Sequence, residues 1–146
     1  MDKLLTLMVM IFLHFFADYH VQGILASMKQ SEWWEKQVEN YGSSMYKNDH
    51  KAVLITHSFE WSFIMMLPLL YEIYHECWGF EYYSVLAAGT YIGLLIINTF
   101  VHYKVDDAKA NRKTINLVKD QSIHLVQVFL TWLIFVFATW KLFMFY

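Results

Sequence analysis

Four long apolar stretches constrain the fold of this chain more than any other feature. A helix needs about 20 mostly apolar residues to cross the hydrocarbon of a bilayer. Four stretches reach that length, at about residues 4–25, 52–74, 82–103 and 123–145. Backbone polar groups must be satisfied internally in a bilayer. The predicted fold is therefore all-α, a single four-helix transmembrane bundle formed by residues 1–146.

The polar residues of the first stretch argue against a cleaved signal peptide. A signal sequence has a basic start and an uninterrupted apolar centre. Here the start holds one lysine, and His14, Asp18 and Gln22 interrupt the apolar run. We therefore expect a retained helix. A short interfacial helix over residues 31–38, with Ser31 as its N-cap, is predicted to follow it.

The basic residues predict the orientation of the bundle. The loops after the first and third stretches, with their flanks, hold nine of the eleven Lys and Arg residues. The other side holds only Lys3 and Lys141. Because cytoplasmic loops carry the excess of basic residues, both termini are expected on the external side.

Composition excludes several classes of function. The chain is 58% hydrophobic and 16% charged, against roughly 25% charged for an average soluble domain. A net charge of −2 argues against a nucleic-acid partner. The single cysteine, Cys77, rules out an internal disulfide and a thiolate-rich metal site built by this chain alone. Phosphate-binding glycine loops, nucleophile elbows and H-E-x-x-H motifs do not occur in the sequence.

Polar residues recur at helical spacing inside the apolar stretches. An ionisable side chain in a membrane helix costs about 2.5–3.5 kcal/mol on insertion scales, and it usually marks a function. His14, Asp18 and Gln22 are spaced four apart and share one helical face. Three further stripes are Asn98, His102 and Asp106; Asp120 and His124; and His57 with Glu60. In the predicted topology all four stripes reach a similar depth on the cytoplasmic side.

This set of imidazoles and carboxylates suits a metal ion. Both groups bind Zn²⁺, Mn²⁺ and Fe²⁺, and ligands one turn apart on facing helices hold such ions in helical bundles. The pattern predicts one or two divalent transition ions (Zn, Mn or Fe). The predicted ligands are His14, Asp18, His57, His102, Asp106, Asp120 and His124. A metal-free hydrogen-bond network and a proton or ion path are the alternatives. Glu60 either joins the site or pairs with a neighbouring helix.

The motifs resemble those of a bacterial and phage family of small integral membrane proteins of unknown function. That family has the pattern H-F-x-A-D-x3-Q near its start and D-Q-x2-H near its end. More loosely, the chain is similar to membrane-bound metal-dependent hydrolases. The resemblance implies a multi-pass protein of the bacterial inner membrane. The matching residues are His14, Phe15, Ala17, Asp18 and Gln22, then Lys29 and a histidine early in the second stretch, then His102, Asp106 and Lys109, then Asp120, Gln121 and His124.

Three classes of function follow from this pattern. The first is a metallohydrolase that cleaves a lipid or other amphiphilic phosphoester at the inner leaflet, with Asp18 or Asp120 as general base and His57 as a ligand or acid. Lys29 or Lys109 would hold the phosphate. The second is ion or proton transport, which nearly apolar outer halves disfavour unless a homo-oligomer supplies a path. The third is a non-enzymatic module, phage-encoded or not, that binds a host or partner protein in the membrane.

Overall fold

The fold is all-α and is built on four long helices. The computed structural model describes residues 2–41, 44–76 and 81–144, and these residues form no β-strand. The long helices are α1 (Lys3–Phe16), α4 (Asp49–Glu76), α5 (Glu81–Ala110) and α6 (Leu117–Met144). The short elements are a π-helix η1 (Ala17–Val21), α2 (Leu25–Met28), α3 (Ser31–Tyr41) and a 3₁₀-helix η2 (Ser44–Asn48).

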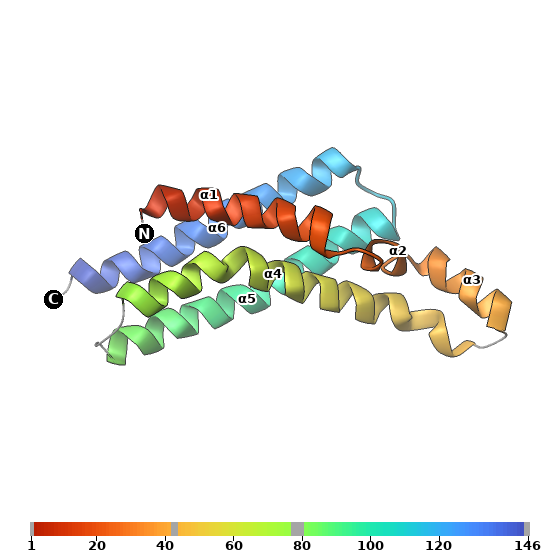
Figure 1. Ribbon diagram of the computed structural model, residues 1–146, viewed down its shortest axis with the longest axis horizontal. Helices are drawn as coiled ribbons and strands as arrows, with labels where there is room; N and C mark the ends of the chain where they lie inside the picture. The colour runs from red at the N-terminus through yellow and green to blue at the C-terminus, as the bar shows by residue number, and fades with distance from the viewer. Residues whose placement is uncertain (1, 42–43, 77–80, 145–146) are drawn as a thin grey trace.

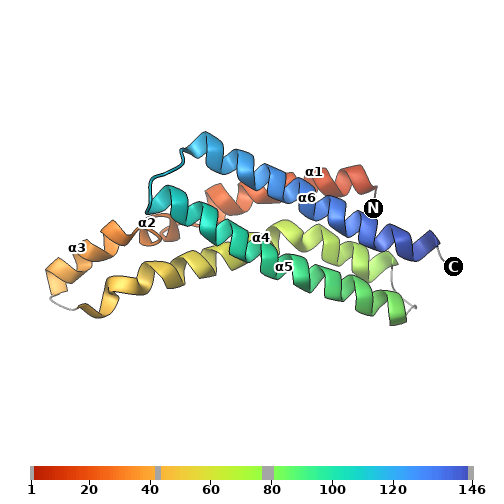
Figure 2. The same ribbon diagram turned by 180° about the vertical axis from the view of Figure 1, so that it is seen from behind.

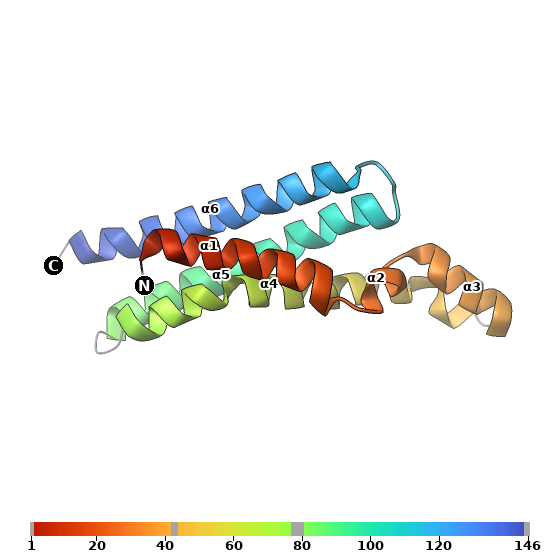
Figure 3. The same ribbon diagram turned by 45° about the horizontal axis from the view of Figure 1, so that its top comes forward.

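The long helices pack side by side as a bundle (Figures 1 and 3). α4 and α5 form an antiparallel hairpin, and α1 packs against both α4 and α6. Four segments are long and apolar enough to cross a membrane: Lys3–Val21, Tyr46–His75, Val85–Ala110 and Leu117–Thr139. The predicted four-helix transmembrane bundle is confirmed.

Two helices extend further at their polar ends than the apolar stretches predict. α5 continues to Ala110 instead of ending near residue 103, and α6 begins at Leu117 instead of near residue 123. The added turns carry buried polar side chains. A prediction from apolar length alone ends the span before such residues, but polar partners on neighbouring helices stabilise them. The predicted end of the last span, at residue 145, lies outside the described residues.

The first span is interrupted rather than continuing as one α-helix to residue 25. α1 passes directly into η1, and the chain then turns at Gly23, whose φ is +45°. Glycine adopts this left-handed conformation at little cost. The side-chain amide of Gln22 donates to the backbone carbonyl of Asp18, so the turn is tied back to the π-helix.

α3 and the first turns of α4 form an arm that projects beyond the bundle (Figures 1 and 2). α3 is the short helix predicted for residues 31–38, and it continues to Tyr41. Its first backbone N–H, at Ser31, donates to the side-chain oxygen of Asn111 at 2.7 Å. The Asn111 amide also donates to the carbonyl of Lys29 at 3.2 Å. The base of the arm is therefore fastened to the end of α5.

The surface and interior of the bundle suit a bilayer. Large apolar side chains such as Phe12, Ile96 and Val126 face outward and are exposed by more than half. The apolar core includes Trp61 and Phe135, which are fully buried. The interior also buries many polar side chains, including all seven predicted metal-site residues. Bundle interiors in membranes tolerate such residues when they pair with one another.

Candidate metal centre

Three imidazoles and three carboxylates converge at one end of the bundle. They come from four elements, so the centre exists only when the bundle is assembled. Each of the six is at most 3% exposed. They are Asp18 on η1, His57 on α4, His102 and Asp106 on α5, and Asp120 and His124 on α6.

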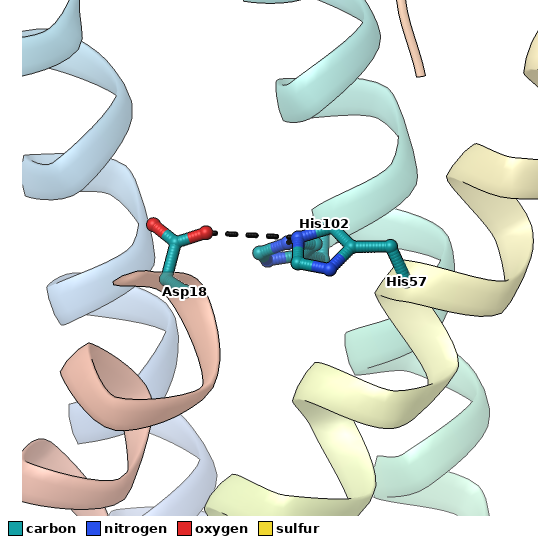
Figure 4. Close-up of side chains that lie close together, drawn as sticks. All are labelled: Asp18, His57 and His102. Atoms are coloured by element: carbon teal, nitrogen blue, oxygen red, sulfur yellow. Dashed lines mark hydrogen bonds and ion pairs between the residues drawn. The ribbon is translucent and has the colours of Figure 1, made fainter. Parts of the chain in front are cut away.

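One group of candidate ligands joins Asp18, His57 and His102 (Figure 4). The Nε2 atoms of His57 and His102 lie 3.3 Å apart. The His57 Nε2 lies 3.6 Å from Oδ1 of Asp18. Figure 4 shows the carboxylate of Asp18 and the two rings pointing toward one another from three different helical segments. Ligand atoms of this group all lie within 4.8 Å of one another.

A second group joins His102, Asp106 and His124. Oδ1 of Asp106 lies 3.7 Å from Nε2 of His102 and 3.5 Å from Nε2 of His124. Nε2 of His124 also lies 3.5 Å from Oδ1 of Asp120. Oδ2 of Asp106 lies 3.4 Å from Nε2 of His57, which links the two groups. Both groups contain His102.

These separations fit a shared ion. With bonds of about 2.0–2.1 Å, two ligands of a tetrahedral zinc ion lie about 3.3 Å apart. Three of the atoms, Oδ1 of Asp106, Oδ1 of Asp120 and Nε2 of His124, are buried without a hydrogen-bond partner. A buried polar atom without a partner is costly. A cation among these lone pairs would satisfy them together.

The outer oxygen of each carboxylate is held by a donor from another element. Lys29 donates to Oδ2 of Asp106 at 2.7 Å, and Lys109 donates to Oδ2 of Asp120 at 2.6 Å. Gln121 donates to Oδ2 of Asp18 at 2.6 Å. Each Oδ1 is left facing the imidazoles. Donors behind the ligands orient metal sites in the same way. Lys29 and Gln121 therefore act on the centre through the carboxylates they hold.

His14 and Asp120 belong to neither group, and His14 also has a different environment from the other predicted ligands. Its Nδ1 accepts a hydrogen bond from the indole N–H of Trp61 at 3.0 Å. In a neutral imidazole the proton then resides on Nε2, so neither nitrogen offers a free lone pair. The Trp61 ring also stacks on His102, with centroids 4.2 Å apart. His14 and Trp61 thus pack behind the ligands, a role that sequence spacing does not reveal.

A buried acidic residue outside the centre, Glu72, lies at the opposite end of the bundle. It is 2% exposed, its Oε2 lies 2.6 Å from Nζ of Lys3, and its Oε1 accepts a hydrogen bond from Thr6. The contacts join α4 to α1. The helical spacing of polar residues did not point to Glu72, although a glutamate near the end of an apolar stretch is a visible signal. The half of the bundle away from the centre is therefore less apolar than predicted. Glu60, by contrast, is half-buried and belongs to neither ligand group.

The ligand set favours a borderline or hard divalent ion. Imidazole and carboxylate suit zinc, manganese and iron, and no thiolate contributes. With neutral imidazoles, the three carboxylates and the ammonium groups of Lys29 and Lys109 leave one net negative charge in the centre. One divalent cation would make that charge positive. The buried groups could therefore hold a metal ion both by geometry and by charge.

Comparisons of the chain with known protein families, with curated proteins and with solved structures find no match.

Proposed function

We propose that this protein is a membrane metallohydrolase that cleaves an amphiphilic phosphoester at the membrane surface. A divalent ion in the centre would polarise a bound water so that it attacks at neutral pH. The basic loops lie at the same end of the bundle as the centre, and the positive-inside rule supports a location at the cytoplasmic leaflet. The proposed membrane is the bacterial inner membrane.

The observation that carries the proposal is the surplus of inward-facing ligands. A catalytic zinc site commonly uses three protein ligands and keeps a position open for water. His102, Asp106 and His124 already form such a set. His57 and Asp18 form the adjoining pair, with Nε2 and Oδ1 3.6 Å apart. A purely structural site has no use for this additional pair.

We assign roles from these positions. His102, Asp106 and His124 hold the ion. Asp18 is the general base, because its Oδ1 faces the ligands while Gln121 holds its Oδ2. His57 completes the coordination or transfers a proton.

One hydrogen-bonded chain leads from the centre toward the middle of the bundle, and it favours hydrolysis over transport. His124 Nδ1 lies 3.4 Å from Gln127 Oε1, and Gln127 donates to Asn98 Oδ1 at 2.8 Å. Asn98 donates to Thr131 at 2.9 Å. The next turn of α6 carries the buried Phe135 of the apolar core. Within the described residues this chain therefore stops inside the bundle, whereas conduction needs a path through both halves.

Metal analysis of the purified protein tests the first part of the proposal. The intact protein and a His20→Ala control should carry one or two equivalents of zinc, manganese or iron, because His20 is exposed and outside both ligand groups. The His102→Ala/His124→Ala variant should lose the metal while keeping its helical circular dichroism. An intact protein that stays metal-free after reloading would refute the proposal.

Product analysis tests the second part. Metal-loaded protein is incubated with total bacterial lipid extract, and products are followed by mass spectrometry. A phosphate-containing product should appear that depends on both the metal and Asp18. Metal binding without any Asp18-dependent product would favour the alternative of a non-enzymatic membrane module with a structural ion.

A further inference from the structure

A pocket opens beside the metal centre at the same end of the bundle. It has a volume of about 340 Å³ and lies between the segment around α2 and the last turns of α5. Three of the side chains that line it are lysines, and one is a carboxylate. They are Lys29, Lys109, Lys113 and Asp106, accompanied by the amides of Gln22 and Gln30.

The pocket reaches the centre directly. Asp106, which belongs to the second ligand group, forms part of its wall and is 1% exposed. Lys29 and Lys109, also in the wall, hold the outer oxygens of Asp106 and Asp120. A ligand in the pocket would therefore meet two ammonium groups and the edge of the metal site together.

The net charge of the metal centre and its lysines indicates which kind of molecule the pocket binds. Without metal, the three carboxylates of the centre neutralise the ammonium groups of Lys29 and Lys109. A divalent ion bound by those carboxylates reverses the net charge, and the ammonium groups then face the pocket without full compensation. A buried site of positive charge recruits an anion. An anion in the pocket and a cation in the centre should therefore bind cooperatively.

Lys113 supplies a third cation from a strained position. Its φ is +53° in the loop three residues after the end of α5, a conformation that side chains disfavour. Its ammonium group pairs with Glu32 at the start of α3, and that lysine lowers the pKa of Glu32. Lys113 therefore adds a third ammonium group at the rim of the pocket.

We infer that this pocket binds a phosphate group, and that it does so together with the metal ion. Phosphate matches a lining of lysines and amide donors, and ammonium groups bind it as point charges. The inference rests on the proposed metal centre and names the part of the substrate that the chain recognises. The phosphate can belong to a lipid headgroup or to a soluble compound.

Manganese binding measured by EPR tests the inference without any activity assay. Mn²⁺ is titrated into the detergent-solubilised protein with and without inorganic phosphate, and the signal of free Mn²⁺ gives the affinity. Phosphate should tighten Mn²⁺ binding about tenfold, within the usual range of coupling between sites. In nanodiscs, phosphatidic acid compared with phosphatidylcholine alone should reproduce the tightening if the source is a lipid headgroup. Tightening by inorganic phosphate alone would identify a soluble source.

Two variants at the rim should change the tightening differently. Lys113→Gln should reduce the tightening several-fold, whereas Glu32→Gln should preserve or increase it because it releases Lys113. Lys104→Gln, an exposed change on α5 outside the pocket, is the control. Because the side chains of Lys113 and Glu32 are exposed, neither substitution should disturb the fold.

The outcomes separate this inference from the proposed function. Mn²⁺ binding that neither phosphate nor phosphatidic acid tightens would overturn the phosphate pocket and leave the metal centre standing. Tightening that is unchanged in Lys113→Gln would also overturn it. A protein that binds no metal at all would overturn both.

Discussion

Replacing Lys29 by methionine should destabilise the metal-free protein far more than the metal-loaded protein. Lys29 is 6% exposed, and its Nζ lies 2.7 Å from Oδ2 of Asp106, which is 1% exposed. Removing one partner of a buried ion pair leaves an uncompensated charge, at a cost of about 3–5 kcal/mol. For a chain of this length that cost corresponds to a decrease of roughly 10 °C in the melting temperature.

A bound divalent ion changes this balance, because it supplies the positive charge that Lys29 no longer provides to Asp106. The Lys29→Met protein should therefore gain more stability from added Zn²⁺ or Mn²⁺ than the native protein gains. The double variant Lys29→Met/Asp106→Asn, which removes both charges, should recover much of the loss in metal-free protein. Lys36→Met, an exposed change on α3, serves as the control.

Thermal unfolding in detergent, with chelator and with excess metal, measures all four proteins. Two results would contradict the reasoning. One is a double variant as unstable as Lys29→Met alone, which would show that the lysine does not act through Asp106. The other is an equal loss of stability with and without metal, which would show that no ion compensates the carboxylate.

Three further predictions concern other parts of the fold. Asn111→Ala should free the start of α3 and cost about 1–2 kcal/mol; hydrogen exchange at residues 31–35 should accelerate, and unchanged exchange would refute the cap. Glu72→Gln should lower stability by about 1–3 kcal/mol through loss of an ion pair whose carboxylate is buried, yet leave metal content unchanged; a loss of metal would show coupling between the two ends. In a cysteine-free background, a membrane-impermeant thiol reagent added from outside should label a cysteine at Asp2 but not one at Thr114, and the reverse pattern would invert the proposed orientation.

The sequence predicted the architecture well because the bilayer limits the choice of folds. Apolar length alone located α1, α4, α5 and α6, and helical spacing alone identified the six residues of the candidate metal centre. Residues such as His102 and Asp106 share a face by the geometry of one helix, so their proximity needs no tertiary information.

Tertiary partners account for what the sequence did not predict. Spacing placed His14 on the same stripe as Asp18, but the side chains meet different neighbours: His14 accepts from Trp61, and Asp18 lies within the π-helix η1. A π-helix changes the angle between successive side chains, and its position is not encoded in apolar periodicity. The use of Lys29 as a partner of Asp106 joins residues far apart in the chain, so only the assembled bundle reveals it.

The length of α4 has a consequence for how substances reach the centre. Its 28 residues span about 42 Å at 1.5 Å per residue, whereas the hydrocarbon of a bilayer is about 30 Å thick. With the C-terminal end of α4 at one boundary of the hydrocarbon, about 12 Å of its N-terminal end stands outside the other boundary. His57 lies eight residues after Asp49, which is about 12 Å along the helix. The centre then sits where hydrocarbon meets the headgroups, so that ions can arrive from water while acyl chains remain in the bilayer.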